Sequence, residues 1–249
     1  MNNSIMVHLL NGDSLNQQFP NDISGERIIC RECLCDGPVD ATFPNDFYQQ
    51  RADFITTLDD EIQITDYYNK SIKEFEKLNS IPSNTEICFW FEDDLFCQVN
   101  FWFIAWLIHN QQKGNTFFLI RPNSISPYSF GAYSQNELKT LFENRVQLLD
   151  LKPFAMLWNF YKNNKLKDLL SQALNLPSEF SFIQEAVNAH LDRLPSDKNE
   201  LARPEKVLLE IASELQTKKF DPIFIEFCKR EPIYGFGDLQ VKMILNKLF

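Results

Sequence analysis

The sequence predicts an α/β protein: a small, mostly parallel, Rossmann-like sheet flanked by helices, followed by an all-α part. Over 1–150, short apolar runs alternate with stretches of helical periodicity, which is the pattern of a parallel sheet with crossover helices. Over 151–249 the strand signal fades and helical periods dominate. Charge divides the chain at the same place, because 1–150 holds 10 basic and 21 acidic residues whereas 151–249 holds 14 and 13. We therefore expect two domains with these bounds.

Four apolar runs in the first part predict strands, because each is closed by turn-forming or charged residues. They cover 6–10, 25–30, 87–91 and 115–120. Apolar residues at helical spacing follow these runs and predict helices over 15–19, 44–58, 62–78, 95–107 and 134–145. The last of these helices begins with a capping box made of Ser134 and Glu137.

Six helical segments are predicted in the second part. They cover 154–161, 166–174, 182–194, 204–215, 222–230 and 239–248. The last three are short and closely spaced, as in a helix-turn-helix or winged-helix module. Contact with nucleic acid through 204–248 therefore stays open, although acids lie beside the basic residues there, which favours a helical interaction module.

Composition excludes several classes of function. A formal net charge of −10 disfavours nonspecific binding to nucleic acid or to anionic membranes. The longest apolar run, 101–108, is far shorter than the roughly 20 residues that cross a bilayer, and no export signal is recognisable, so we expect a cytoplasmic protein. No glycine-rich phosphate loop occurs among the seven glycines, so nothing indicates NAD, FAD or a nucleoside-triphosphate loop, and nothing indicates haem. Six cysteines do not form the dense framework of a small secreted fold, which predicts reduced thiols. Cys30, Cys33 and Cys35 lack the second well-spaced pair that a structural zinc site needs.

Acidic residues follow three of the predicted strands. Asp13 follows the first, Glu32 the second, and Glu92 and Asp94 the third. The carboxyl ends of parallel strands form the ligand-binding edge of an open α/β sheet. We therefore predict these four acids as catalytic candidates. Three of them, Asp13, Glu92 and Asp94, would bind Mg²⁺ or Mn²⁺, because hard carboxylate oxygens suit these ions.

Four further residues complete the predicted site. Arg31 would hold a phosphate group in a two-pronged grip, and Ser14, Gly37 and Gln98 are predicted to contact the same ligand. The hypothesis is a metal-assisted site that binds a phosphate- or nucleotide-type ligand or processes a phosphoester; whether it is catalytic stays open.

The alternative is a regulatory or interaction protein in which the acids are structural. One carboxylate before a helix is enough to cap it. In that interpretation the acids pair with Arg31, Arg51 or Arg121, and the C-terminal helices contact protein or DNA.

Three motifs in the first part, together with one in the second, resemble known families. The first three are Gly12-Asp13-Ser14, Arg31-Glu32-x-Leu34-x-x-Gly37-Pro38 and Trp90-Phe91-Glu92-x-Asp94-Leu95-Phe96-x-Gln98. They resemble the bacterial domain of unknown function 1835. The fourth is His190-Leu191-x-Arg193-x-Pro195-Ser196-x-x-Asn199-x-Leu201 with Glu205 beyond it. It resembles the associated domain of unknown function 3658.

The resemblance implies a bacterial protein with this order of domains, and it implies no reaction. The sequence departs from the family pattern at Cys30, where tryptophan is usual, at Asp93, where histidine is frequent, and at Ala202, where serine or threonine is usual. An acid in place of a histidine makes the site more negative.

Overall fold

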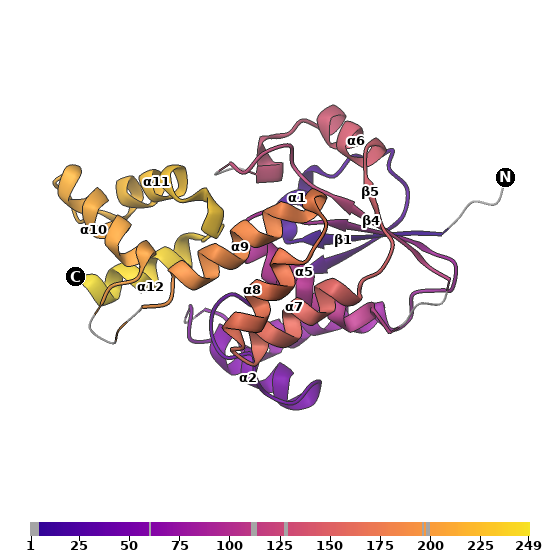
Figure 1. Ribbon diagram of the computed structural model, residues 1–249, viewed down its shortest axis with the longest axis horizontal. Coiled ribbons are helices and arrows are strands. Elements are labelled where there is room, and N and C mark those ends of the chain that lie inside the picture. Colours follow the sequence, from indigo (N-terminus) through magenta and orange to yellow (C-terminus); the bar gives the residue numbers. More distant parts are fainter. Residues whose placement is uncertain (1–4, 60, 111–113, 127–128, 196, 198–199) are drawn as a thin grey trace.

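A computed structural model describes residues 5–249 except 60, 111–113, 127–128, 196 and 198–199 (Figure 1). Its described residues form a five-stranded sheet of order β2-β1-β3-β4-β5. The strands are β1 Met6–Asn11, β2 Glu26–Cys30, β3 Glu86–Trp90, β4 Thr116–Ile120 and β5 Val146–Leu148. The pairs among β2, β1, β3 and β4 are parallel, and β5 is antiparallel to β4. The predicted α/β class with a mostly parallel sheet is confirmed.

Helices cover both faces of the sheet, which explains why the strands are apolar runs rather than alternating patterns. Alternate strand residues face opposite sides: Leu9 belongs to the larger core cluster, whereas Leu10 and Trp90 belong to the smaller one. The smaller cluster lies beneath α1 Asp13–Gln18 and α6 Gln135–Glu143, which Figure 1 shows above the sheet. The larger cluster lies beneath α2 Asn45–Ile55, α4 Lys73–Leu78 and α5 Leu95–Ile108.

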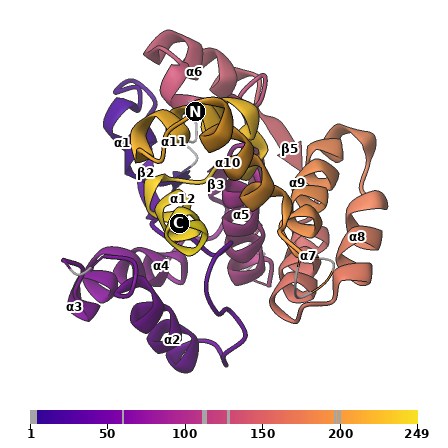
Figure 2. The same ribbon diagram turned by 90° about the vertical axis from the view of Figure 1, so that its left-hand side faces the viewer.

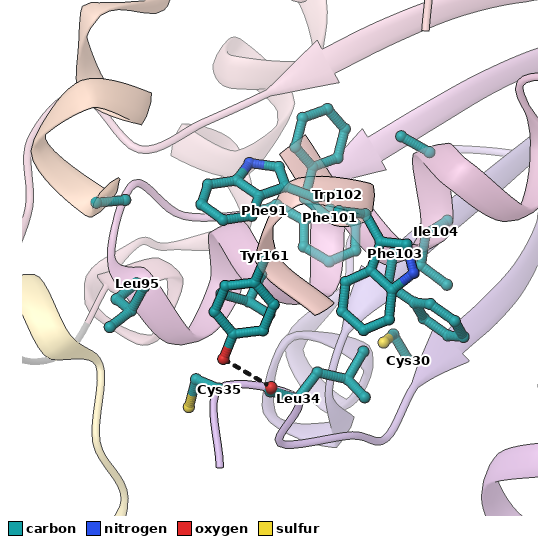
Figure 3. Packing of buried hydrophobic residues seen from close by; sticks show 14 of the residues in the cluster. Cys30, Leu34, Cys35, Phe91, Leu95, Phe101, Trp102, Phe103, Ile104 and Tyr161 are labelled. Atoms are coloured by element: carbon teal, nitrogen blue, oxygen red, sulfur yellow. Dashed lines mark hydrogen bonds between the residues drawn. The ribbon is translucent and has the colours of Figure 1, made fainter. Parts of the chain in front are cut away.

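Helix α5 is the centre of the larger core, because it is apolar on nearly all sides and lies between the sheet and a second layer of helices. Phe101 contacts Phe89 of β3 with ring centroids 5.3 Å apart. On the other side, Trp102 contacts Tyr161, whose hydroxyl donates to the Leu34 carbonyl at 3.1 Å (Figure 3). The helix that follows the acids therefore ties the sheet to the second half of the chain.

Two parts of the first half differ from the sequence-based expectation. The helix expected over 62–78 is interrupted: α3 Ile64–Tyr67 passes through a π-helical turn, η1 Tyr68–Ile72, into α4. The edge strand β5 was not predicted, and the helix expected to reach residue 145 ends at Glu143. Three residues carry too little periodicity to predict a strand, and β5 exists because it pairs with β4.

The second half is helical, as predicted, and no strand lies among the described residues of 151–249. Its helices are α7 Lys152–Lys162, α8 Leu166–Leu174, α9 Ser181–Asp192, α10 Arg203–Glu214, α11 Phe220–Arg230 and α12 Asp238–Leu248, with the short turns η3 Ser178–Phe180 and η4 Pro232–Tyr234. Helix α7 packs on α5, so the larger core continues across residue 150. Helices α10 to α12 form a separate group beyond α9 (Figure 1). The domain boundary at 150 stays a prediction.

None of the described helices is long and apolar enough to cross a membrane.

Candidate functional site

The candidate site lies where the order of the strands changes direction. Strands β1 and β3 are neighbours although β2 lies between them in sequence, and ligands of open α/β sheets bind at such a switch point. Asn11 ends β1 there, and Glu92 and Asp94 follow β3. A pocket of about 260 Å³ opens at this edge. It is lined by Asn11, Ser14, Leu15, Glu92, Asp94, Phe96, Cys97, Ser126, Ser129, Phe130, Gly131, Phe227, Cys228, Glu231, Pro232, Gly235 and Phe236.

Three side chains at one wall of the pocket form what we call the acid–thiol group: Glu92, Asp94 and Cys97. One potential ligand atom from each lies within 4.8 Å of the others. The geometry follows from the start of α5, because Asp94 is its N-cap and accepts a hydrogen bond from the Cys97 backbone N–H at 2.9 Å. The Cys97 thiol donates to Glu92 Oε2. Capping thus brings the thiol between two carboxylates.

The acid–thiol group has an excess of negative charge. Burial, and secondly the charge of Glu92, raise the pKa of Asp94 to about 7. Burial and the two carboxylates hold the pKa of the Cys97 thiol well above its usual range. Among the described residues that line the pocket, none is lysine, arginine or histidine. A cation bound here would supply the charge that these side chains lack.

Two carboxylates and a thiol are chemically suited to a divalent metal ion. Among the described residues, the acid–thiol group is the one place where at least three candidate metal ligands come together. Carboxylate oxygens suit Mg²⁺ and Mn²⁺, whereas a thiolate suits Zn²⁺. The mixed set therefore fits Mn²⁺ or Zn²⁺ better than Mg²⁺.

Asp13 and Arg31 form an ion pair with each other. Arg31 Nε and Nη2 donate to the two oxygens of Asp13, each at 2.8 Å, and Arg31 Nη1 donates to the Lys70 carbonyl at 2.8 Å. Asp13 was predicted as a metal ligand, but the structure does not bring it into the acid–thiol group. Arg31 was predicted to hold a phosphate, and it does not line the pocket, whereas Ser14 does.

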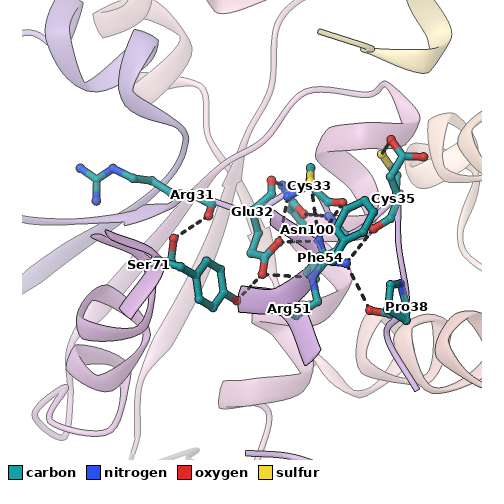
Figure 4. A network of polar contacts seen from close by, with 12 residues as sticks. Arg31, Glu32, Cys33, Cys35, Pro38, Arg51, Phe54, Ser71 and Asn100 are labelled. Carbon is teal, nitrogen blue, oxygen red and sulfur yellow. Dashed lines mark hydrogen bonds and ion pairs between the residues drawn. The ribbon is translucent and has the colours of Figure 1, made fainter. Parts of the chain in front are cut away.

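Glu32, a predicted catalytic acid, lies in a buried polar network (Figure 4). Its Oε2 is 2.9 Å from Arg51 Nη2, and Tyr67 donates its hydroxyl to Oε1. Arg51 also donates to the Asp36 carbonyl at 2.7 Å. Since these partners satisfy the carboxylate and fix the loop after β2, Glu32 belongs to the scaffold in this arrangement.

Gly37 and Gln98, two predicted ligand contacts, lie outside the pocket. Gly37 has φ +73°, and a Cβ there would lie 2.5 Å from the ring of Phe54. Gln98 is buried, and its Nε2 donates to the Glu92 carbonyl at 2.7 Å, so it orients the backbone of the acid–thiol group. Gln98 Oε1 has no hydrogen-bond partner among the residues described.

Asp93 is neutralised separately from its two neighbours. Arg121 donates from Nε and Nη2 to the two oxygens of Asp93, each at 2.6 Å. Of the three consecutive acids, Asp93 is therefore paired with an arginine, whereas Glu92 and Asp94 line the pocket.

Sequence reasoning missed two groups of site residues. Cys97 was not singled out, although it lies three residues after an N-cap acid, and this spacing indicates contact within the first helical turn. The wall formed by Phe227, Cys228, Glu231 and the 232–237 turn has no sequence signal, because it comes from the other half of the chain.

No family model matches the chain, and neither a curated protein nor a solved structure shows significant similarity to it. Membership of the two domain families named above therefore stays a prediction. Two positions of the fourth motif, Ser196 and Asn199, lie outside the described residues. At the start of α10, the Ala202 backbone N–H donates to the Glu205 side chain at 2.6 Å, which is the half of a capping box that does not require a hydroxyl at this position.

Proposed function

We propose that the protein binds a divalent metal ion at Glu92, Asp94 and Cys97 and, through this ion, holds a small phosphorylated ligand in the adjoining pocket. One observation supports this most directly: three potential ligand atoms lie within 4.8 Å of one another at the switch point of the sheet. Phosphate is repelled by two carboxylates, and no cationic side chain lines the described pocket. The ligand therefore depends on the metal for its attraction.

The pocket restricts the size of the ligand. Its volume of about 260 Å³ lies just below the roughly 300–1,000 Å³ of typical drug-sized ligand sites. A small phosphorylated metabolite fits better than a dinucleotide. Ser14, Ser126 and Ser129 are among the residues that line the pocket, and serine hydroxyl groups can donate to phosphate oxygens. A bound metal would also polarise a phosphoryl oxygen and lower the pKa of a metal-bound water, as phosphoester hydrolysis requires.

Calorimetric titration with Mn²⁺ and with Zn²⁺ tests the metal site. We expect wild type to bind and Asp94→Asn to lose binding, because the substitution removes a charged ligand. Asparagine is as good an N-cap as aspartate, so the variant should fold. The matched control is Asp93→Asn, which changes the adjacent acid that pairs with Arg121 and should leave metal binding unchanged. Equal binding by wild type and Asp94→Asn would contradict the proposal.

The phosphate part has its own test. Inorganic phosphate and small sugar phosphates are titrated into wild type with and without Mn²⁺. We expect binding only when the metal is present. Binding of equal strength in the presence of a chelator would show that the metal does not attract the ligand.

A second candidate function is a non-enzymatic regulatory or interaction protein, and one observation favours it. The three arginines that the alternative hypothesis named all pair with edge acids: Arg31 with Asp13, Arg51 with Glu32 and Arg121 with Asp93. These pairs give three acids a structural role. Absence of metal binding by wild type would favour this function, and retention on a DNA duplex that falls with salt would indicate its nucleic-acid form.

A further inference from the structure

We infer that the C-terminal helices are the second half of the ligand site, in which the turn 232–237 between α11 and α12 holds Asp94 in position and forms a wall around the ligand. This inference rests on the proposed function, because it assigns a role in that same site. It gives α10 to α12 a function in binding a small molecule.

Gly235, in the second half of the chain, lies against Asp94 of the acid–thiol group. Its φ is +63°, and a Cβ there would lie 2.0 Å from Asp94 Oδ1 and 3.1 Å from Phe96 Cβ. Real Cβ atoms do not approach other atoms so closely, and the left-handed conformation also favours glycine. Asp94 cannot move away freely, because Oδ1 accepts the capping hydrogen bond from Cys97. Gly235 is therefore a positioning residue for Asp94.

The walls of the pocket come from both halves of the chain. Asn11 and Ser14 come from the first half, whereas Phe227, Glu231 and Phe236 come from the second. Figure 2 views the molecule from the side of α10 to α12 and shows them in front of the sheet and α5. A ligand seated on the acid–thiol group would therefore contact both halves at once.

The 232–237 turn is held by contacts within the second half of the chain. Tyr234 is fully buried, and its ring centroid lies 5.1 Å from that of Phe236. Before the turn, Glu231 pairs with Arg203 of α10, with 2.9 Å between Oε2 and Nη2. These contacts give the turn a defined shape before any ligand binds.

A polar contact on the far side of Phe236 joins the two halves. Asp36, in the loop after β2, accepts from Gln240 of α12 and from Arg193 Nη1, the latter at 3.2 Å. Arg193 is largely buried and also donates to the Cys35 carbonyl. The contact between Gly235 and Asp94 is thus reinforced by a second, independent link between the halves.

The surface charges of α11 and α12 agree with this role. Lys229 and Arg230 pair with Glu226, and Lys242 pairs with Asp238. Basic side chains that already pair with acids attract a phosphate backbone only weakly. These ion pairs therefore make nucleic-acid binding by α11 and α12 less favourable. The residues of this region that line the pocket include no lysine, arginine or histidine.

Alanine substitutions at two glycines of the turn test the inference. Gly235→Ala places a methyl group against Asp94. Gly237→Ala is the matched control, because Gly237 does not line the pocket, its φ is −78° and the nearest atom to its Cβ would be 3.8 Å away. We expect Gly235→Ala to weaken Mn²⁺ binding by about tenfold or more, as is typical when a contact that orients a ligand residue is lost. Gly237→Ala should bind as wild type does.

A pH profile separates positioning from general destabilisation. The titratable groups around Asp94 are Glu92 and Cys97 from its own segment, and Glu231 and Cys228 across the pocket. Displacing Asp94 towards solvent should lower the pH at which half-maximal Mn²⁺ binding occurs in Gly235→Ala. A loss of thermal stability alone would not move this midpoint. A folded Gly235→Ala protein with the affinity and the pH midpoint of wild type would overturn the inference and leave the proposed function intact.

Hydrogen exchange on wild type provides a test that does not depend on a variant folding. We expect the amides of 232–237 to exchange more slowly when Mn²⁺ and inorganic phosphate are both bound than in the chelated protein. Unchanged exchange there, despite measured binding of both probes, would refute a role of the turn as a wall. If wild type binds no metal, the proposed function itself fails, and that outcome is recognised before either variant is made.

Discussion

Glu32 and Arg51 form an ion pair in which both side chains are completely buried, with 2.9 Å between Glu32 Oε2 and Arg51 Nη2. Arg51 further donates to the carbonyl groups of Cys33, Asp36 and Pro38, so it organises the loop after β2 (Figure 4). A buried ion pair adds little stability beyond what apolar residues would provide, but breaking it leaves a charge without a partner.

Arg51→Met should therefore destabilise the protein by about 3–5 kcal/mol, because Glu32 stays buried without its cation. Guanidinium-induced unfolding at neutral pH measures this. The control is Arg31→Gln, which breaks the partly exposed pair with Asp13 and should cost only about 0–1 kcal/mol. Similar losses for the two variants would argue against a scaffold role of the Glu32–Arg51 pair.

Metal affinity should depend on pH through Asp94. Because the pKa of Asp94 is raised to about 7 and the ligands must be ionised, affinity for Mn²⁺ should rise steeply as pH increases towards about 7. Above that pH it should rise less steeply, because only the Cys97 thiol, whose pKa lies well above its usual range, still has a proton to lose. Calorimetric titrations across this range measure it. Affinity that is flat between about pH 6 and about pH 8 would mean that Asp94 is not a ligand.

The free energy of unfolding of the metal-free protein should also depend on pH through Asp94, and it should fall as the pH rises. The folded-state pKa of Asp94 lies above its ordinary value of 3.8, so its stabilising contribution is complete below 3.8 and is lost as pH rises through about 7. Asp94→Asn does not ionise. With chelator present, its stability relative to wild type should therefore increase from about pH 5 to about pH 8, which urea unfolding at the two values would reveal.

The contribution of His8 to stability should depend on pH in the opposite direction to that of Asp94. Burial lowers its pKa from 6.5 to about 4, and its Nδ1 accepts from Trp90 Nε1 at 3.1 Å while Nε2 faces the Ser24 carbonyl at 3.2 Å. Its contribution to stability is present above 6.5 and is lost as pH falls towards 4. His8→Gln should lose less stability than wild type over this range, which urea unfolding at its two limits would reveal.

If Cys97 binds the metal ion, its thiolate should give an absorption band in the Co²⁺ complex of the protein. A cobalt–thiolate bond gives a charge-transfer band in the near ultraviolet, and a thiolate ligand favours zinc over manganese. We expect the band in wild type and in Cys228→Ser, whose cysteine lies elsewhere on the pocket wall, and we expect Cys97→Ser to lose it. Cys97→Ser should also lose more affinity for Zn²⁺ than for Mn²⁺. A band that persists in Cys97→Ser would exclude this thiol as a ligand.

The class of the fold and the type of most elements could be predicted from local patterns in the amino-acid sequence. Short apolar runs closed by turns, and long stretches at helical spacing, result from burial on the two faces of a sheet and on one side of each helix, which are local properties of the chain. The acids after the strands also placed the candidate site at the carboxyl edge, because the direction of parallel strands fixes which ends meet.

Which of the acids are available to a ligand depends on contacts between distant parts of the chain. From the sequence, Asp13, Glu32, Glu92 and Asp94 are similar candidates. The difference between them arises because Arg31 and Arg51 reach Asp13 and Glu32 from other elements, just as Arg121 reaches the neighbouring Asp93. The position of Gly235 against Asp94 was equally out of reach of the sequence. Such contacts join residues far apart in the chain, and they depend on strand order and on the packing of the helices, which no local pattern encodes.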